Sequence, residues 1–139
     1  MSASLTEIQI TWYNAVRKCI EQTHAASDVP TDVKSDMTAN GYTASATEAN
    51  CIAYQDTYAP GKRMVYRLLT EAEWIECYKT GKLNSHPQFE WVGDAYDFSR
   101  RVLRIYDNPT NRSNDSPGDD YFNYYSIYNS YGFRLARIV

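Results

Sequence analysis

Apolar positions near the start of the chain recur with helical spacing. In residues 11–23, TWYNAVRKCIEQT, apolar side chains stand at Trp12, Val16 and Ile20, about one helical turn apart. This spacing predicts an amphipathic helix with one buried face. Thr11 stands directly before it and is the expected N-cap, because its hydroxyl can accept from a free backbone N–H of the first turn.

The middle of the chain contains the most clearly marked element. Residues 64–68, MVYRL, predict a strand. Thr70 and Glu73 then have the T-x-x-E spacing of a capping box, in which each side chain accepts from the other residue's backbone N–H. Gly81 is the expected stop, since glycine adopts the left-handed conformation that ends many helices. A second helix is therefore predicted between Thr70 and Gly81.

The remaining segments are assigned from their turn residues and their alternation of apolar and polar positions. Loops are predicted at 28–42 and 108–120, a short helix at 47–56, and strands at 89–98, 100–107 and 132–139. Helices followed by strands predict one α+β domain over residues 1–139, with an antiparallel sheet.

Composition narrows the class of protein. The chain has 139 residues, 43% of them hydrophobic, and a net charge of -3, which describes one folded domain. We expect no nucleic-acid partner, because no basic stripe is present to neutralise phosphates. No apolar run is long enough to span a membrane, and residues 1–16 lack the pattern of a signal peptide. A cytoplasmic, virion-associated or partner-displayed location is left open.

The cysteines are three in number, Cys19, Cys51 and Cys77, and none has C-x-x-C spacing. We expect buried free thiols. A disulfide between Cys51 and one of the others is the alternative.

Several segments together resemble one known family. They are ITWYNAVRKC (10–19), YRLLTEAEW (66–74), FEWVGD (89–94), RRVLR (100–104) and GFRLAR (132–137). They are similar, in the same order, to motifs of the formylglycine-generating-enzyme/sulfatase-modifying family. The resemblance implies a C-type-lectin-like fold with two helices, a twisted antiparallel sheet and a loop-rich ligand face.

The chain departs from this family where the family's enzymes carry their chemistry. The resemblance places a cysteine pair between the RVLR and GFR motifs, yet residues 105–131 contain no cysteine. Without thiolates this segment offers neither a soft copper(I) site nor a sulfur nucleophile. Ile105 and Tyr106 also replace the glycines that follow RVLR in the family. We therefore expect a protein that is not an enzyme.

The same scaffold is used by variable proteins of diversity-generating retroelements, whose diversified segment ends just before a GFRLA-like strand. In those proteins template adenines mutate, and changes at the adenines of an AAC codon cannot produce Lys, Glu, Gln, Met or Trp. None of these five residue types occurs in residues 92–139, whereas all occur in residues 1–91. The chain resembles such a variable protein, although strands and turns also disfavour Lys and Glu.

The predicted ligand-binding surface is rich in tyrosine and asparagine, as antibody paratopes are. Tyrosine offers a large rigid contact area, and asparagine and serine offer adaptable hydrogen bonds. The alternative is that alternate tyrosines line a half-buried strand. The candidate ligand-binding residues are Tyr106, Asp107, Asn108, Asn111, Asn114, Tyr121, Asn123, Tyr124, Tyr125, Tyr128, Asn129 and Tyr131.

Other conspicuous residues receive structural interpretations. Three tryptophans, Trp12, Trp74 and Trp91, are expected in the core. Two distant histidines, His24 and His86, receive no metal or catalytic role. Three acids on the predicted helix, Glu71, Glu73 and Glu76, are expected to cap it or face solvent.

No cofactor is expected; calcium at Asp94, Asp97, Asp119 and Asp120 is the alternative, although their spacing matches no defined loop. SHPQFE at 85–90 resembles a streptavidin-binding tag, and both natural and engineered origins remain open.

Three functions are compatible with these observations. The first is a non-catalytic variable protein that binds a protein or glycan through its C-terminal surface. The second is a virion structural or decoration protein that packs through the same surface. The third is a minimal formylglycine-generating-type oxidase. The sequence does not specify the ligand, the host, the display mode or the oligomeric state.

Overall fold

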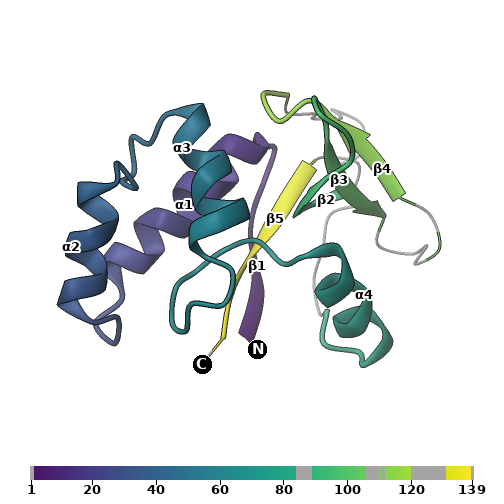
Figure 1. Cartoon of the computed structure of the whole chain (residues 1–139). Coiled ribbons are helices and arrows are strands. Elements are labelled where there is room, and N and C mark those ends of the chain that lie inside the picture. Colours follow the sequence, from purple (N-terminus) through teal and green to yellow (C-terminus); the bar gives the residue numbers. More distant parts are fainter. Residues whose placement is uncertain (1, 84–88, 106–109, 111, 120–130, 139) are drawn as a thin grey trace.

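The computed structural model describes residues 2–83, 89–105, 110, 112–119 and 131–138, and these form a mixed α+β domain. Figure 1 shows helices α1, α2 and α3 on one side of the strands and α4 on the other. The elements are β1 (Ser2–Ile8), α1 (Trp12–Ala25), α2 (Thr31–Ala39), α3 (Glu48–Ala53), the π-helical turn η1 (Tyr54–Tyr58), α4 (Glu71–Lys79), β2 (Phe89–Ala95), β3 (Arg101–Ile105), β4 (Arg112–Asp115) and β5 (Tyr131–Arg137).

The described strands form one sheet in the order β1-β5-β2-β3-β4. Strand β5 runs antiparallel to β1 on one side and parallel to β2 on the other, with Phe89 opposite Tyr131. The last strand in sequence thus lies inside the sheet, between β1 and β2. Because β1 pairs with β5, the two ends of the chain lie side by side (Figure 1).

Both faces of the sheet are covered by apolar side chains. Trp91, Leu103 and Phe133 join the cluster that contains the buried face of α1. Their neighbours on the opposite sheet face, Val92 and Val102, pack with α4. Since successive strand residues point to opposite faces, this two-sided burial explains the continuous apolar runs of β2 and β3.

Several expectations about individual elements are confirmed. Helix α1 begins after Thr11, whose hydroxyl accepts from the Asn14 backbone N–H at 3.0 Å. Helix α4 begins with the complete Thr70–Glu73 capping box. Gly81, with a φ of 71°, follows its last turn. The tryptophans at 12, 74 and 91 are buried, and the three cysteines are buried free thiols.

The predicted architecture is wrong in two respects. The sheet is mixed and not wholly antiparallel, because β2 and β5 run parallel. The described residues contain four α-helices, whereas the family resemblance implies two; the short helix predicted at 47–56 is present as α3, and α2 is the helix that was not predicted. Helix α2 lies in the predicted loop 28–42: Pro30 is its N-cap and Met37 its buried anchor. Proline and aspartate at the start of a segment mark helix beginnings as well as loops.

Three strand assignments also differ from expectation. Residues 64–68 contain one isolated bridge, that of Arg67 with Ala136, and a second bridge joins the preceding Arg63 to Ile138. Met64 has a φ of 70°, outside the range of a strand. Strand β4 lies inside the predicted polar loop 108–120, and β1 was not predicted. Both are edge strands with polar or mixed sequences, so their apolar signal is weak.

Candidate functional site

Two members of the predicted ligand-binding set, Asn114 and Tyr131, lie among the described residues. They belong to β4 and β5. The other predicted positions lie outside the described residues: Tyr106, Asp107, Asn108, Asn111, Tyr121, Asn123, Tyr124, Tyr125, Tyr128 and Asn129.

Tyr131 is held on three sides. Its ring makes edge-to-face contacts with Trp91 and Phe89, with centroid distances of 5.3 and 5.9 Å. Its hydroxyl donates to Asp115 Oδ2 at 2.7 Å. Tyr131 is half-buried, so it joins the start of β5 to the end of β4 and also borders the surface.

Asn114 stands on the edge strand β4, opposite Val102 of β3. Its Oδ1 accepts from Arg100 Nη1 at 3.0 Å. Arg100 also donates from Nε to Asp97 Oδ2 at 2.8 Å. The Arg100 guanidinium, helped by the Ser99 N–H, lowers the pKa of Asp97 to about 2. Asn114 is therefore fixed by a charged network that belongs to the β2–β3 connection.

This connection carries exposed aromatic residues that the sequence assigned to strands. Tyr96 is 41% exposed and Phe98 is fully exposed. The guanidiniums of Arg100 and Arg112 lie 5.0 and 5.2 Å from the Tyr96 ring centroid, so two cations flank one aromatic ring. The signal that could have revealed them is YDFSR, a turn-like run between two apolar strands. We call residues 96–100 the hairpin tip.

Two acidic side chains of α4 form ion pairs with arginines outside the helix, beyond the capping and solvent-facing roles expected from the sequence. Glu71 was expected to cap the helix or face solvent, but its Oε2 lies 3.0 Å from Arg112 Nε and 3.1 Å from Arg104 Nη1. Glu73 caps α4 and also binds the buried Arg67, at 2.7 and 2.8 Å. The acids of the TEAEW motif thus fix arginines of the sheet and its flanking segment.

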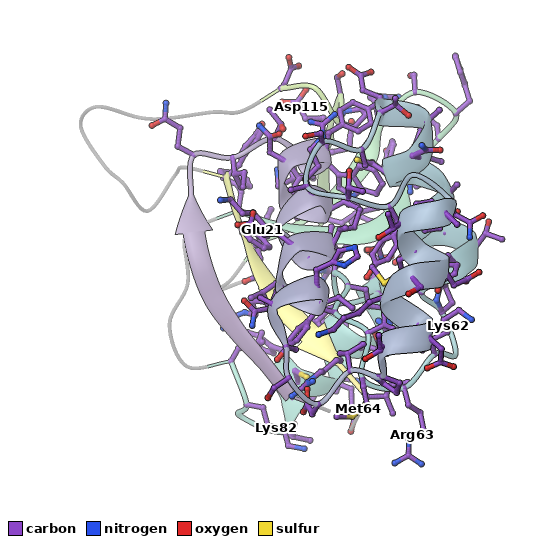
Figure 2. All side chains as sticks on the ribbon, turned by 90° about the vertical axis from the view of Figure 1, so that its left-hand side faces the viewer. Glu21, Lys62, Arg63, Met64, Lys82 and Asp115 are labelled. Carbon is purple, nitrogen blue, oxygen red and sulfur yellow. The ribbon has the colours of Figure 1, made fainter. Side chains whose placement is uncertain are left out.

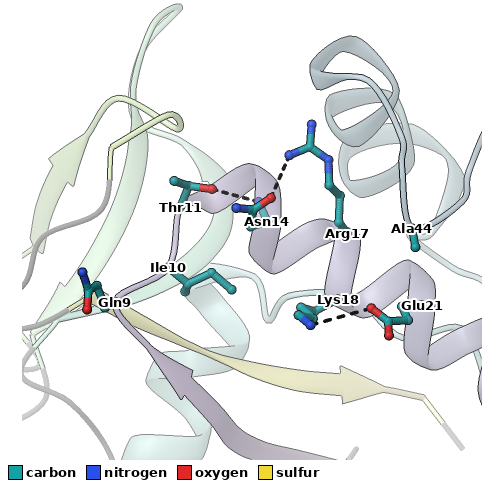
Figure 3. Close-up of a pocket in the computed structure, with 8 residues that line it drawn as sticks. All are labelled: Gln9, Ile10, Thr11, Asn14, Arg17, Lys18, Glu21 and Ala44. Carbon is teal, nitrogen blue, oxygen red and sulfur yellow. Dashed lines mark hydrogen bonds and ion pairs between the residues drawn. The ribbon is translucent and has the colours of Figure 1, made fainter.

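A polar pocket of about 390 Å³ lies beside the start of β5 (Figure 3). Within it, Arg17 donates from Nε to the Ala46 carbonyl and from Nη1 to Asn14 Oδ1, both at 2.8 Å. Ile10 connects the pocket to β5, because its N–H donates to the Tyr131 carbonyl at 3.2 Å. The pocket is lined by Gln9, Ile10, Thr11, Asn14, Arg17, Lys18, Glu21 and Ala44.

The described cysteines have the environment of structural thiols. Cys19, Cys51 and Cys77 lie in three different helices. Burial raises the pKa of the Cys19 thiol well above its usual range, and burial also raises that of Cys51. Deprotonation, which makes a thiol nucleophilic, is therefore disfavoured at these two positions.

The acids considered for calcium have other partners. Asp94 Oδ1 accepts from the Glu71 backbone N–H at 2.8 Å, and Asp97 is bound to Arg100. Asp120 lies outside the described residues, as do residues 85–88 of SHPQFE and with them His86. Among the residues that the structure describes, no group of three or more His, Cys, Asp or Glu side chains is placed to hold a metal ion.

Comparison with known proteins adds no relative. No family model, no curated protein and no solved structure matches the chain. Within the described residues, no helix combines the length and the apolar character needed to cross a membrane.

Proposed function

We propose that the chain is a non-catalytic ligand-binding protein on a C-type-lectin-like scaffold, and a variable protein of a diversity-generating retroelement. Its Tyr-, Asn- and Ser-rich segment before Gly132 would recognise a protein or glycan. The alternatives are a virion structural or decoration protein and a minimal formylglycine-generating-type oxidase.

The observation that carries this proposal is the change in burial at Gly132. Tyr131 is half-buried and ends the tyrosine-rich segment. From Gly132 the chain enters the core: Phe133 and Arg134 are each about 1% exposed, and Ala136 is fully buried. The chain is therefore fixed in the core from Gly132 onward, and our proposal assigns the positions that can change at lower cost to the segment before it.

Buried ion pairs in the segments that resemble family motifs support the proposal of a fixed scaffold. Arg67, Arg101, Arg104 and Arg134 are all buried. Each forms an ion pair with a carboxylate from another part of the chain: Arg67 with Glu73, Arg101 with Asp56, Arg104 with Glu71 and Arg134 with Glu90. These side chains hold elements together, which supports the proposal that these segments form a fixed scaffold.

The oxidase alternative has less support. The segment 105–131 contains no cysteine, and the thiols present are buried in helices. Oxygen consumption that depends on copper and a thiol substrate would favour the oxidase over our proposal.

The first test is sequencing of the DNA that flanks the coding region. We expect a reverse transcriptase gene and an imperfect repeat of the codons for about residues 101–137, differing from the gene at adenine positions of the repeat. A repeat with differences at all four bases, or no repeat, would contradict the retroelement assignment.

The second test addresses tolerance to change. A variant with serine at Tyr121, Tyr124, Tyr125 and Tyr128 should retain the wild-type melting temperature within a few degrees, because these positions are predicted to serve binding. The matched control replaces Phe133, the buried residue that follows Gly132 in β5, and should unfold the domain. A large loss of stability in the tyrosine variant would assign the segment to the core.

A further inference from the structure

The sequence contains one asparagine that is followed directly by glycine, Asn40–Gly41. In such a pair the backbone nitrogen of the glycine can reach the side-chain amide carbon of the asparagine, because glycine has no Cβ to hinder the approach. Asn40 is exposed, so water can reach the reacting atoms. The pair follows α2, the helix farthest from the strands in Figure 1, and Figure 2 looks onto that side of the molecule.

The reaction open to this pair is deamidation through a cyclic imide. A bond forms between the Gly41 nitrogen and Asn40 Cγ while the bond between Cγ and Nδ2 breaks. The amide leaves as ammonia, which carries away the proton lost from the Gly41 N–H. Water then adds to either carbonyl of the ring and opens it, which leaves aspartate or isoaspartate at position 40.

The end of α2 holds the pair in an unreactive geometry. The Gly41 N–H donates to the Thr38 carbonyl at 3.0 Å. The Tyr42 N–H donates to the Met37 carbonyl at 2.9 Å, which completes a Schellman motif. The proton that the attacking nitrogen must lose is therefore held in a hydrogen bond. Asn40 also has a ψ of 0°, which turns the Gly41 nitrogen toward the backbone nitrogen of Asn40 and away from its Cβ.

The leaving group is held as well, and the fold requires the glycine. Asn40 Nδ2 donates to the Asp36 carbonyl at 2.8 Å. Gly41 has a φ of 80°, and a Cβ at this position would lie 2.6 Å from Asn50 Nδ2. The structure thus keeps the residue that makes Asn40 reactive and suppresses the reaction with hydrogen bonds that exist only while the cap of α2 is closed.

Helix α2 has few anchors that would keep this cap closed. Met37 is its one fully buried side chain, and Val33 packs beside it. Pro30, the N-cap residue, makes no side-chain capping hydrogen bond. Elements with few buried contacts open locally at a lower free energy than the whole domain, so we expect the end of α2 to open while the rest of the domain stays folded.

We propose that Asn40 is a site of spontaneous deamidation controlled by the Schellman motif of α2: the closed cap suppresses the reaction, and local opening permits it. The product weakens the cap. Its new carboxylate lies at the negative end of the helix dipole, and an isoaspartyl linkage lengthens the backbone within the motif. Tyr42, whose ring packs against Tyr54 and Tyr58, then loses the hydrogen bond that fixes its backbone. Deamidation thereby converts a transient opening into a lasting one.

The experiment measures deamidation of the whole chain, folded and unfolded by urea, at one pH and temperature. Trypsin releases residues 35–62 as one peptide that contains both Asn40 and Asn50, and mass spectrometry distinguishes the two positions. In the unfolded chain Asn40 should react at least about tenfold faster than Asn50, because Cys51 has a Cβ that hinders the attack. Absence of product at Asn40 in the unfolded chain would overturn the proposal.

Hydrogen exchange of the Gly41 N–H tests the control by the cap. Exchange and ring closure both require this N–H to leave the Thr38 carbonyl, so both report the same opening. The folded chain should therefore deamidate at Asn40 more slowly than the unfolded chain by the protection factor of Gly41, to within about tenfold. A ratio of rates outside this range, including equal rates despite a protected Gly41, would also overturn the proposal.

Two variants complete the test. Asn40→Gln is the matched control: it keeps a side-chain amide but would have to form a larger ring, so no product should accumulate at position 40. Asn40→Asp supplies the charge of the product and should speed exchange of the Tyr42 N–H; unchanged exchange would contradict the lasting opening. These outcomes do not depend on the retroelement assignment, which the flanking DNA tests separately.

Discussion

Arg134 donates from Nε to both carboxylate oxygens of Glu90, at 3.0 and 2.9 Å, in an ion pair with almost no access to solvent. The pair joins the interior strand β5 to its parallel neighbour β2. Replacing Glu90 by Leu leaves the buried Arg134 guanidinium without its acceptor, and we expect a loss of about 3–5 kcal/mol in the free energy of unfolding. Urea denaturation measures this change. The control is Asp28→Asn, which breaks the exposed pair with Arg137 and should have a much smaller effect.

The same carboxylate should give the protein a characteristic pH dependence. Burial is the main cause that raises the pKa of Glu90 from 4.5 to about 7, against the opposing attraction of Arg134. Between these values the folded state binds more protons than the unfolded state, so this group's contribution to stability falls as the pH rises.

Comparison of the wild type with Glu90→Gln isolates this contribution. The stability difference between the two proteins should change steadily from pH 5 to pH 7, as measured by urea denaturation at each pH. The wild type should lose stability relative to the variant as the pH rises. A change in the opposite direction would mean that Arg134 outweighs burial and holds the pKa of Glu90 below its usual value.

The capping box of α4 allows a local test. The Thr70 hydroxyl accepts from the Glu73 N–H at 3.1 Å, and Glu73 Oε1 accepts from the Thr70 N–H at 2.8 Å. Thr70→Ala should lower the free energy of unfolding by about 1 kcal/mol. Thr70→Ser keeps the hydroxyl and should stay close to wild type. Equal losses in the two variants would assign the effect to the threonine methyl group.

Tyr131 and Asn114 should respond differently to mutation, although both are predicted ligand-binding residues. Tyr131→Ser removes the ring contacts with Trp91 and Phe89 and the hydrogen bond to Asp115, and should cost on the order of 2 kcal/mol. Asn114→Ser removes one exposed contact with Arg100, and should change stability by less than about 0.5 kcal/mol. Thermal unfolding compares the two. Similar small changes would mean that Tyr131 belongs wholly to the variable surface.

Gly93 is required by a close approach of two segments. A Cβ at this position would lie 2.4 Å from Gln55 Nε2. Gln55 in turn donates to the Leu68 carbonyl and accepts from the Leu68 N–H, at 3.3 and 3.0 Å. Gly93→Ala should therefore cost about 1–3 kcal/mol. A Cβ at Gly118 would lie 4.0 Å from Ser116 Oγ, so Gly118→Ala should be nearly neutral. Urea denaturation compares the two variants.

The elements that could be predicted from sequence are those with local signals. Helix α1 has a complete apolar face, and α4 has both its capping box and Gly81. The parallel pairing of β2 with β5 depends on contacts more than 40 residues apart, and no local pattern encodes it. Helix α2 was missed because its apolar face is short: Met37 is its one fully buried side chain, and Val33 packs beside it.

The candidate site was predictable only in part. Composition pointed to the segment that ends at Tyr131, and most of its members lie outside the described residues. The aromatic tip at Tyr96 and Phe98 was missed because its residues are also good strand formers. Their exposure follows from the turn between β2 and β3, which a strand assignment through 89–98 concealed.

The position of β5 between β1 and β2 also has a consequence for synthesis. During translation β1 is made first, but its partner in the sheet consists of residues 131–137. Until those residues leave the ribosome, β1 and the β5-facing edge of β2 lack their partner, and Glu90 has no Arg134. Nascent chains that stall before Arg134 should therefore be substrates for chaperones and proteases, and the domain should complete its fold only after release of its last strand.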